Sequence, residues 1–155
     1  MLATFSCRRL SSASRRLEQP LGRITRPLTG RTVLIVEDDF LVGHDLRAFL
    51  EEAGAAILGP IDDIARACDV ARVQAIDGAV LDVHLWDDTA APVAVELTAR
   101  QVPFIVVSGY GPEDIPPAMR GATYLAKPVR RLELVNVAAA MFSRSARLLG
   151  RSSRA

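Results

Sequence analysis

The sequence is poor in lysine, cysteine and aromatic residues, and it has no long apolar segment. Of the 19 basic side chains in 155 residues only Lys127 is a lysine, and aromatic residues make up 5%. No apolar run approaches the ~20 residues that a membrane-spanning helix requires, so we expect no membrane segment. The two cysteines, Cys7 and Cys68, lack the spacing of a metal site and are interpreted as reduced thiols of a cytoplasmic protein.

Charge is distributed unevenly along the chain. Residues 1–27 contain six arginines and a single acid, Glu18, whereas the remainder holds 13 basic and 17 acidic side chains, a net charge of −4. Binding to nucleic acid requires a basic face, so this balance argues against direct binding to DNA or RNA. We predict a disordered basic extension over residues 1–29 and a disordered tail over 146–155; an Arg- and Ser-rich start is also a feature of organellar transit peptides.

Residues 30–145 alternate between strand-like and helix-like patterns. Half of the chain is hydrophobic, which is enough for the core of one domain. Short β-branched runs separated by segments of helical length are typical of buried parallel strands. The predicted strands are 32–36, 55–58, 78–82, 103–107 and 122–125, and the predicted helices are 40–53, 62–73, 90–100 and 132–149. The pattern therefore predicts one α/β domain with five strands.

The fourth connection, residues 109–117, differs from the others. It contains three prolines and two glycines where a helix is otherwise expected. Proline lacks an amide donor and clashes with the preceding helical turn, so we expect a loop or one short turn here. Such a segment is easily moved, which makes it a candidate switch or partner surface.

Polar side chains follow four of the five predicted strands. They are Glu37 and Asp38 after the first strand, Asp82 after the third, Ser108 after the fourth and Lys127 after the fifth. Ligands of parallel sheets bind beyond the carboxyl ends of the strands, so we expect these side chains to share one edge. Lysine is a compact charge on a flexible stem, suited to reaching a carboxylate or phosphate there.

The acidic residues of this edge predict a magnesium site. Mg²⁺ prefers carboxylate oxygens and accepts phosphate oxygens as further ligands. We predict that Asp38 and Asp82 bind the ion directly and Glu37 through water, and that the backbone carbonyl of His84 adds another oxygen. Asp82 stands alone at its strand end, whereas the other two acids are paired, so we predict Asp82 as the nucleophile toward a phosphoryl donor.

The remaining residues of the edge have two interpretations. Lys127 and the hydroxyl of Ser108 would hold the phosphoryl oxygens, by charge and by hydrogen bond. Structural roles also fit: Glu37 and Asp38 are suited to the N-terminus of the first helix, and Ser108 to a turn. Asp39 is predicted to cap that helix.

Four motifs occur together: Val36-Glu37-Asp38-Asp39, Leu81-Asp82-Val83, Ser108-Gly109 and Lys127-Pro128. In their order and spacing they resemble the receiver domain of two-component response regulators, over about residues 30–145. The resemblance implies a flavodoxin-like, doubly wound sheet of five parallel strands in the order 2-1-3-4-5, flanked by five helices. It also implies that Asp82 accepts a phosphoryl group from a sensor histidine kinase or a phosphotransfer protein, with Mg²⁺ bound.

The same resemblance assigns Ser108 and Tyr124 as switch residues that move toward the phosphoryl group, and Lys127 as the lysine of the family. It implies that the side chains two residues beyond Asp82 and Ser108, namely His84 and Tyr110, influence the loss of phosphate. A bulky pair at these positions predicts a long-lived phosphoryl group.

A narrower likeness lies in Pro103-Phe104 and Ser108-Gly109-Tyr110-Gly111. These motifs are similar to the FATGUY-type receivers, which carry a Phe-Ala-Thr-Gly-Tyr type motif and a reduced fourth helix, although Val106-Val107 replaces the Phe-Ala portion. Members of that subgroup are often single-domain regulators of alphaproteobacteria that work with kinases of the HWE/HisKA2 class. We expect a monomer or weak homodimer with a downstream protein partner, because the dimerisation face usual in the family includes the fourth helix that is altered here.

Two other functions fit parts of the sequence. The first is a pseudo-receiver, which would bind partners without phosphorylation. The joint presence of the acidic pair, Asp82 and Lys127 argues against it. A haloacid dehalogenase-like phosphohydrolase needs a second aspartate two residues beyond the first, where this chain has His84. We therefore expect a module that catalyses only its own phosphorylation and dephosphorylation. Trp86-Asp87-Asp88 either contacts a partner or covers the sheet edge.

Overall fold

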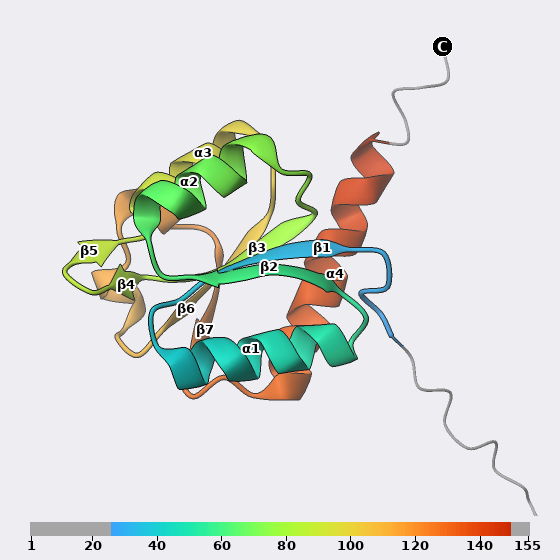
Figure 1. The fold of residues 1–155 in the computed structure, drawn as a ribbon, viewed down its shortest axis with the longest axis horizontal. Coiled ribbons are helices and arrows are strands. Elements are labelled where there is room, and N and C mark those ends of the chain that lie inside the picture. The colour runs from blue at the N-terminus through green and yellow to red at the C-terminus, as the bar shows by residue number, and fades with distance from the viewer. Residues whose placement is uncertain (1–25, 150–155) are drawn as a thin grey trace, which may run out of the picture.

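The structure, a computed structural model, describes residues 26–149, with side chains as far as Phe142. Residues 1–25 of the predicted extension and 150–155 of the predicted tail lie outside the described residues. The five strands of the central sheet are β1 Thr32–Val36, β2 Ala56–Ile61, β3 Gly78–Asp82, β6 Phe104–Ser108 and β7 Thr123–Ala126. They pair in parallel in the order β2-β1-β3-β6-β7, which is the predicted order 2-1-3-4-5 once the two short strands outside this sheet are set aside (Figure 1).

Four α-helices cover the two faces of the sheet. They are α1 Phe40–Glu52, α2 Ile64–Val73, α3 Ala91–Ala99 and α4 Arg131–Leu149. Helices α2 and α3 lie on one face, and α1 and α4 lie on the other (Figure 1). No helix within residues 26–149 is long and apolar enough to cross a membrane.

Alternating side chains of the strands build two cores. In β1, Leu34 and Val36 pack into the core beneath α2 and α3. Val33 and Ile35 point to the opposite core, beneath α1 and α4, because successive side chains of a strand face opposite sides. A side chain at Gly78 would overlap the ring of Phe142, so this glycine lets α4 pack directly against β3.

The fourth connection contains no α-helix, as predicted. Two short 3-10 helices, η1 Pro112–Asp114 and η2 Pro117–Met119, replace it. Each has a proline at its first position, where the missing amide costs no hydrogen bond. The receiver resemblance implies five flanking helices, whereas residues 26–149 contain four α-helices. The two 3-10 turns take the place of the helix between β6 and β7, which agrees with the expected irregular fourth helix.

A hairpin between β3 and α3 was not predicted. Strands β4 His84–Leu85 and β5 Asp88–Thr89 pair antiparallel to each other and form a separate two-stranded sheet. In Figure 1 the hairpin projects from the domain near the carboxyl ends of the sheet strands. It carries the Trp86-Asp87-Asp88 segment, with the side chain of Trp86 exposed.

Regular structure is described on both sides of residues 30–145. Residues 27–30 form a turn in which Leu28 is fully buried, and the Leu28 amide donates to the Ala53 carbonyl at 2.9 Å. At the other end α4 continues to Leu149, so residues 146–149 belong to a helix. The division of the chain at residues 29 and 145 stays a prediction.

Strand β2 is also longer than predicted, because it continues through Gly59 and Pro60 to Ile61. The register between β1 and β2 shifts between Leu34 and Val36. Proline is tolerated on an edge strand, and β2 is at the edge of the sheet.

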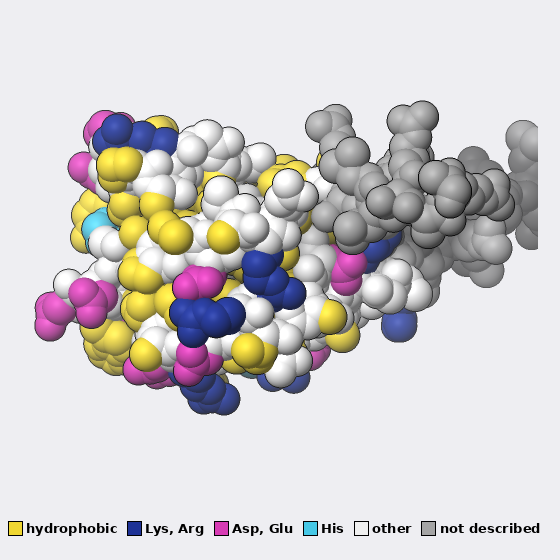
Figure 2. All heavy atoms as spheres, turned by 90° about the horizontal axis from the view of Figure 1, so that it is seen from above, with side chains coloured by type: hydrophobic (Ala, Val, Ile, Leu, Met, Phe, Trp, Pro, Cys, Tyr) yellow, Lys and Arg dark blue, Asp and Glu magenta, His cyan; other side chains and the backbone are white. Residues whose placement is uncertain are grey.

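The face formed by α2 and α3 shows mixed charge. Seen from this side, basic and acidic side chains alternate with scattered apolar atoms (Figure 2). One of the ion pairs here joins the two helices, with Arg72 Nη2 2.7 Å from Glu96 Oε1. The pairing holds the pKa of Glu96 below its usual value.

Candidate functional site

The carboxyl ends of β1, β3 and β7 bring Lys127 between two acids. Lys127 Nζ donates to Asp82 Oδ2 at 2.6 Å and to Glu37 Oε1 at 3.0 Å. These residues are 45 and 90 positions from Lys127 in the sequence. The sheet order explains the contact, since parallel strands end on the same edge. Three of the predicted site residues therefore meet as one charge cluster.

Glu37 is the most deeply buried acid of this cluster, with 2% of its surface exposed. Its Oε2 atom lies 2.9 Å from Lys127 Nζ, yet it accepts no hydrogen bond from the described residues. Burial raises the pKa of Glu37 to about 7; the Lys127 hydrogen bond opposes this shift, and the charge of Asp82 reinforces it. Removal from water disfavours the charged form of a carboxyl group, which is the physical cause of this shift.

The pKa of Lys127 is also raised, which for an ammonium group favours the charged form. Burial alone would lower the pKa of its ammonium group, but hydrogen bonds to Asp82 and Glu37 outweigh burial and raise that pKa above its usual value. The ammonium is therefore held charged between the acids.

A divalent cation fits this cluster. One oxygen each of Glu37, Asp38 and Asp82 lies within 4.8 Å of the others. The buried Oε2 of Glu37 is ion-paired with Lys127 but accepts no hydrogen bond, so it keeps lone pairs for a metal ion. Hard oxygen donors of this kind suit Mg²⁺. The donor set therefore agrees with the predicted magnesium site.

The first helix is capped by Asp39, as predicted. Asp39 Oδ1 accepts from the amides of Leu41 and Val42 at 2.8 and 3.0 Å. Glu37 Oε1 accepts from the Asp39 amide at 3.2 Å, so it supports the loop before the helix. Because Asp39 fills the capping position, Glu37 and Asp38 are left to face the sheet edge.

Asp38 has a partner that sequence reasoning missed. Its Oδ2 atom accepts a hydrogen bond from the main-chain amide of Trp86 at 2.8 Å. Trp86 lies in the turn of the unpredicted hairpin, and its φ is 53°. A main-chain donor in an irregular loop leaves no signal in the sequence, so only the structure reveals it.

Ser108 and Tyr124 contact the loop that begins the fourth connection. Ser108 is 2% exposed, and its Oγ accepts from the Tyr110 amide at 3.0 Å. The Tyr124 hydroxyl donates to the Tyr110 carbonyl at 2.6 Å. The Lys127 amide donates to the Ser108 carbonyl at 2.8 Å. The predicted switch residues thus hold the same loop from two adjacent strands.

His84 lies at the base of the hairpin. Its ring meets the ring of Tyr110 edge-on, with centroids 5.2 Å apart and planes at 76°. The two side chains predicted to influence phosphate loss are therefore in contact. The metal-binding role of the His84 carbonyl stays a prediction.

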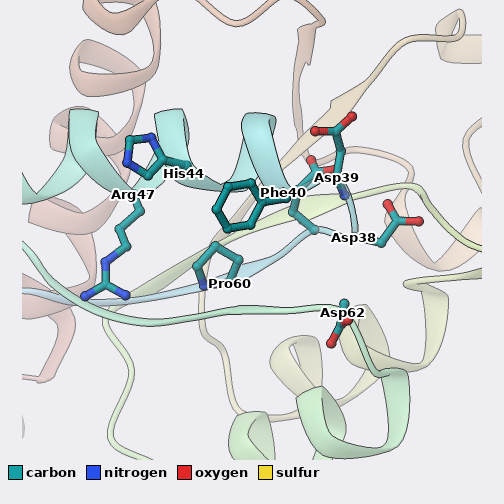
Figure 3. Close-up of a pocket in the computed structure, with 8 residues that line it drawn as sticks. Asp38, Asp39, Phe40, His44, Arg47, Pro60 and Asp62 are labelled. Carbon is teal, nitrogen blue, oxygen red and sulfur yellow. The ribbon is translucent and has the colours of Figure 1, made fainter.

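A pocket of about 360 Å³ adjoins the acidic cluster between the start of α1 and the end of β2. Figure 3 shows the ring of Phe40 above Pro60 in the middle of this pocket. The carboxylates of Asp38 and Asp62 lie toward one end, and the side chain of Arg47 lies toward the other. The pocket offers an approach to the acids that is partly apolar.

Comparisons with known proteins agree with this fold. No model of a known protein family matches the chain. The chain is 29% identical over 109 residues to the transcriptional regulatory protein PdtaR of Mycobacterium tuberculosis, covering 68% of this chain and 53% of PdtaR. It therefore spans about half the length of the curated relatives it matches.

Two solved structures illustrate the likeness. SdrG from Sphingomonas melonis Fr1 is 33% identical, with a TM-score of 0.64 over 74% of this chain and 97% of SdrG. The receiver domain of sensor histidine kinase PA1611 from Pseudomonas aeruginosa, which has a magnesium ion coordinated in its active site cleft, is 24% identical. Its TM-score is 0.65 over 74% of this chain and 99% of that domain.

The chain has the CheY-like fold, and its structure neighbours are receiver domains of response regulators. The narrower FATGUY-type assignment stays a prediction.

Proposed function

We propose that the protein is a phosphoryl-accepting response regulator in which Asp82 takes a phosphoryl group from a phosphohistidine. The observation that carries this proposal is the position of Lys127 Nζ, 2.6 Å from Asp82 Oδ2 and also bound to buried Glu37. A charged lysine in this place has an anion to bind before phosphorylation and a more highly charged one afterwards.

The transfer uses the carboxylate of Asp82 as nucleophile. Lys127 holds Oδ2, and no hydrogen bond from the described residues reaches Oδ1, so we assign Oδ1 as the attacking atom. A bond forms between Oδ1 and phosphorus while the phosphorus–nitrogen bond of the donor breaks. The electron pair of that bond stays on the donor imidazole, which then takes up a proton.

Glu37, Asp38 and Asp82 would hold Mg²⁺, with the His84 carbonyl as a further ligand. When bound, the ion neutralises charge on the phosphoryl oxygens. Apart from this, Lys127 contributes a positive charge, and the sheet edge fixes the positions of the acids. Asp82 is 7% exposed, so water has limited access to the acceptor.

Ser108 and Tyr124 are proposed as the switch. The Ser108 Oγ now accepts from the Tyr110 amide, which leaves its hydroxyl hydrogen free to donate to a phosphoryl oxygen. Any movement of Ser108 toward the phosphoryl group pulls on the loop that the Tyr124 hydroxyl holds through the Tyr110 carbonyl. Phosphorylation is thereby coupled to residues 109–117.

The finer assignment is a cytoplasmic, single-domain regulator of the FATGUY type that works with a kinase of the HWE/HisKA2 class, as a monomer or weak homodimer. The 3-10 turns at residues 112–119 support it, since that subgroup has a reduced fourth helix. The pocket beside Phe40 is proposed to receive the phosphodonor protein.

Incubation of the full chain with Mg²⁺ and acetyl phosphate, followed by intact-mass measurement, tests the function. We expect the mass of one phosphoryl group to be added, and Asp82→Asn to abolish the addition. Asp45→Asn is the matched control, because Asp45 is 69% exposed on α1 and should leave the addition unchanged. If neither acetyl phosphate nor a histidine kinase phosphorylates the protein, the pseudo-receiver function replaces this proposal.

A further inference from the structure

The turn of the β4–β5 hairpin has an unusual backbone. Trp86 adopts φ 53°, and the only other non-glycine residue with positive φ in the described part of the chain is Gln101, at φ 58°. The left-handed region is unfavourable for a bulky side chain. Burial of the indole does not explain the conformation, because Trp86 is 73% exposed.

The Trp86 amide instead points to a reason for it. The amide donates to Asp38 Oδ2 at 2.8 Å, across 48 positions of sequence. No other hydrogen bond reaches the Asp38 carboxylate from the main chain of residues 26–149 or from the side chains of residues 26–142. Asp38 is one of the three acids whose oxygens lie within 4.8 Å of one another. The strained turn therefore contacts the candidate metal site directly.

Three contacts fix the base of the hairpin to the rest of the domain. Leu85 is 1% exposed and belongs to the core beneath α2 and α3. The Ala90 amide donates to the Val83 carbonyl at 3.0 Å and closes the base of the hairpin. The ring of His84 packs against Tyr110. A turn held at its base in this way keeps the Trp86 amide at a fixed place.

We infer that the β4–β5 hairpin is a positioning element for Asp38, and that the main-chain amide of Trp86 sets the affinity of the acidic cluster for a divalent cation. The inference rests on the proposed function, because it takes this cluster as the magnesium site. Groups that hydrogen-bond a metal ligand fix its orientation, and their loss weakens metal affinity by about 10- to 100-fold. Residues held in sparsely populated backbone regions often occur at such sites.

Two substitutions of Trp86 distinguish the contribution of its main-chain amide from that of its indole side chain. Trp86→Gly and Trp86→Val both remove the indole and keep the amide. Glycine accepts φ 53° without strain, whereas a β-branched residue resists it and should displace the amide from Asp38. By isothermal titration calorimetry we expect Mg²⁺ affinity within about twofold of the parent for Trp86→Gly, and about tenfold weaker for Trp86→Val.

Gln101→Val is the matched control. It imposes the same backbone conflict at φ 58°, at the end of α3 and without a contact to Asp38. It should lower thermal stability and leave Mg²⁺ affinity unchanged. Equal affinity of the Gly and Val variants of Trp86, or an equal loss of affinity in Gln101→Val, would overturn the inference.

A measurement that needs no change at residue 86 complements these variants. In the metal-free protein, Asp38→Ala should speed hydrogen exchange of the Trp86 amide by at least about tenfold, since the amide loses its acceptor. The amides of β6 should keep their exchange rates. An unchanged rate at Trp86 contradicts the inference. If the parent protein binds no Mg²⁺, the proposed metal site itself is wrong, and this outcome is distinguishable from an unchanged exchange rate at Trp86.

Discussion

Carboxylates at the two ends of the central sheet differ in burial and in hydrogen bonding. Before β3, Asp77 satisfies both oxygens: Oδ1 accepts from Arg31 at 3.1 Å and Oδ2 from the Thr32 amide at 2.8 Å. At the opposite end Glu37 is more deeply buried, with its side chain 0% exposed against 32% for Asp77. Yet Glu37 has an oxygen without a hydrogen bond.

This difference separates a structural acid from one available for binding. A half-exposed carboxylate with two donors contributes to the connection between neighbouring strands. Glu37 is buried and ion-paired with Lys127, yet its Oε2 atom accepts no hydrogen bond and keeps lone pairs for a metal ion. The burial that raises the pKa of Glu37 costs stability when that carboxyl group is charged, and a bound cation is expected to restore part of it.

Removal of Lys127 should change the carboxyl edge most. Lys127→Ala leaves Glu37 and Asp82 without their cation, and we expect a loss of about 2 kcal/mol in unfolding free energy. The expected loss is smaller than for a fully buried ion pair, because the side chain of Lys127 is partly exposed. Urea unfolding at pH 8 in EDTA measures it. Mg²⁺ should recover part of the loss.

Lys127→Arg keeps the charge and should retain more stability than Lys127→Ala. A planar guanidinium does not reproduce the compact ammonium between two acids, so coupling from Asp82 to Ser108 and Tyr124 should be impaired. Phosphorylation-induced shifts of the Ser108 and Tyr124 resonances in NMR spectra report this coupling. Shifts identical to those of the parent would show that Lys127 has no role beyond its charge.

Glu37→Gln should remove a pH dependence. The pKa of Glu37 is raised to about 7 from 4.5, so the folded state binds this proton more tightly than the unfolded state. Its contribution to stability is complete below about pH 4.5 and is lost as the pH rises through about 7. In metal-free protein, urea unfolding at pH 5 and pH 8 should show a smaller decline in the variant than in the parent. An equal decline in both proteins would mean that Glu37 does not titrate in this range.

Asp77→Ala tests the opposite edge. It removes one ion pair and one main-chain hydrogen bond at a partly exposed position, so we expect a loss of about 1 kcal/mol. Mg²⁺ affinity, measured by calorimetry, should match that of the parent. A substantial fall in Mg²⁺ affinity would show that the two ends are coupled, and the comparison would fail.

The smallest expected effect concerns the aromatic contact beside Asp82. His84→Ala and Tyr110→Ala each open space next to the acceptor, and loss of phosphate should quicken by a few-fold, about 1 kcal/mol or less. Intact-mass measurement after removal of the phosphodonor follows the decay. Loss of phosphate from the parent within seconds would contradict the predicted shielding.

Much of the fold was predictable because its signals are local. Apolar runs of four or five residues marked the strands, and the prolines of residues 109–117 excluded a regular fourth helix. The placement of Glu37, Asp82 and Lys127 at one edge followed from the topology of parallel sheets. Their chemical roles stay predictions, since geometry alone does not show transfer of a phosphoryl group.

Other features left no local signal. Two-residue hairpin turns favour Asn-Gly or Asp-Gly, but the turn between β4 and β5 contains Trp86-Asp87. A single leucine among polar residues shows no periodicity, so the burial of Leu28 was not evident. Tertiary contacts determine both features.

Pro60 has a consequence for how copies of the domain meet. Strand β2 is at the outer edge of the sheet, where unpaired amides can recruit a strand from another molecule. Pro60 has no amide to offer, and Gly59, at φ 108°, bends the strand just before it. A foreign strand therefore finds an interrupted row of donors along this edge. The same dipeptide that lies at the register shift inside the sheet is therefore expected to limit open-ended strand addition at this edge.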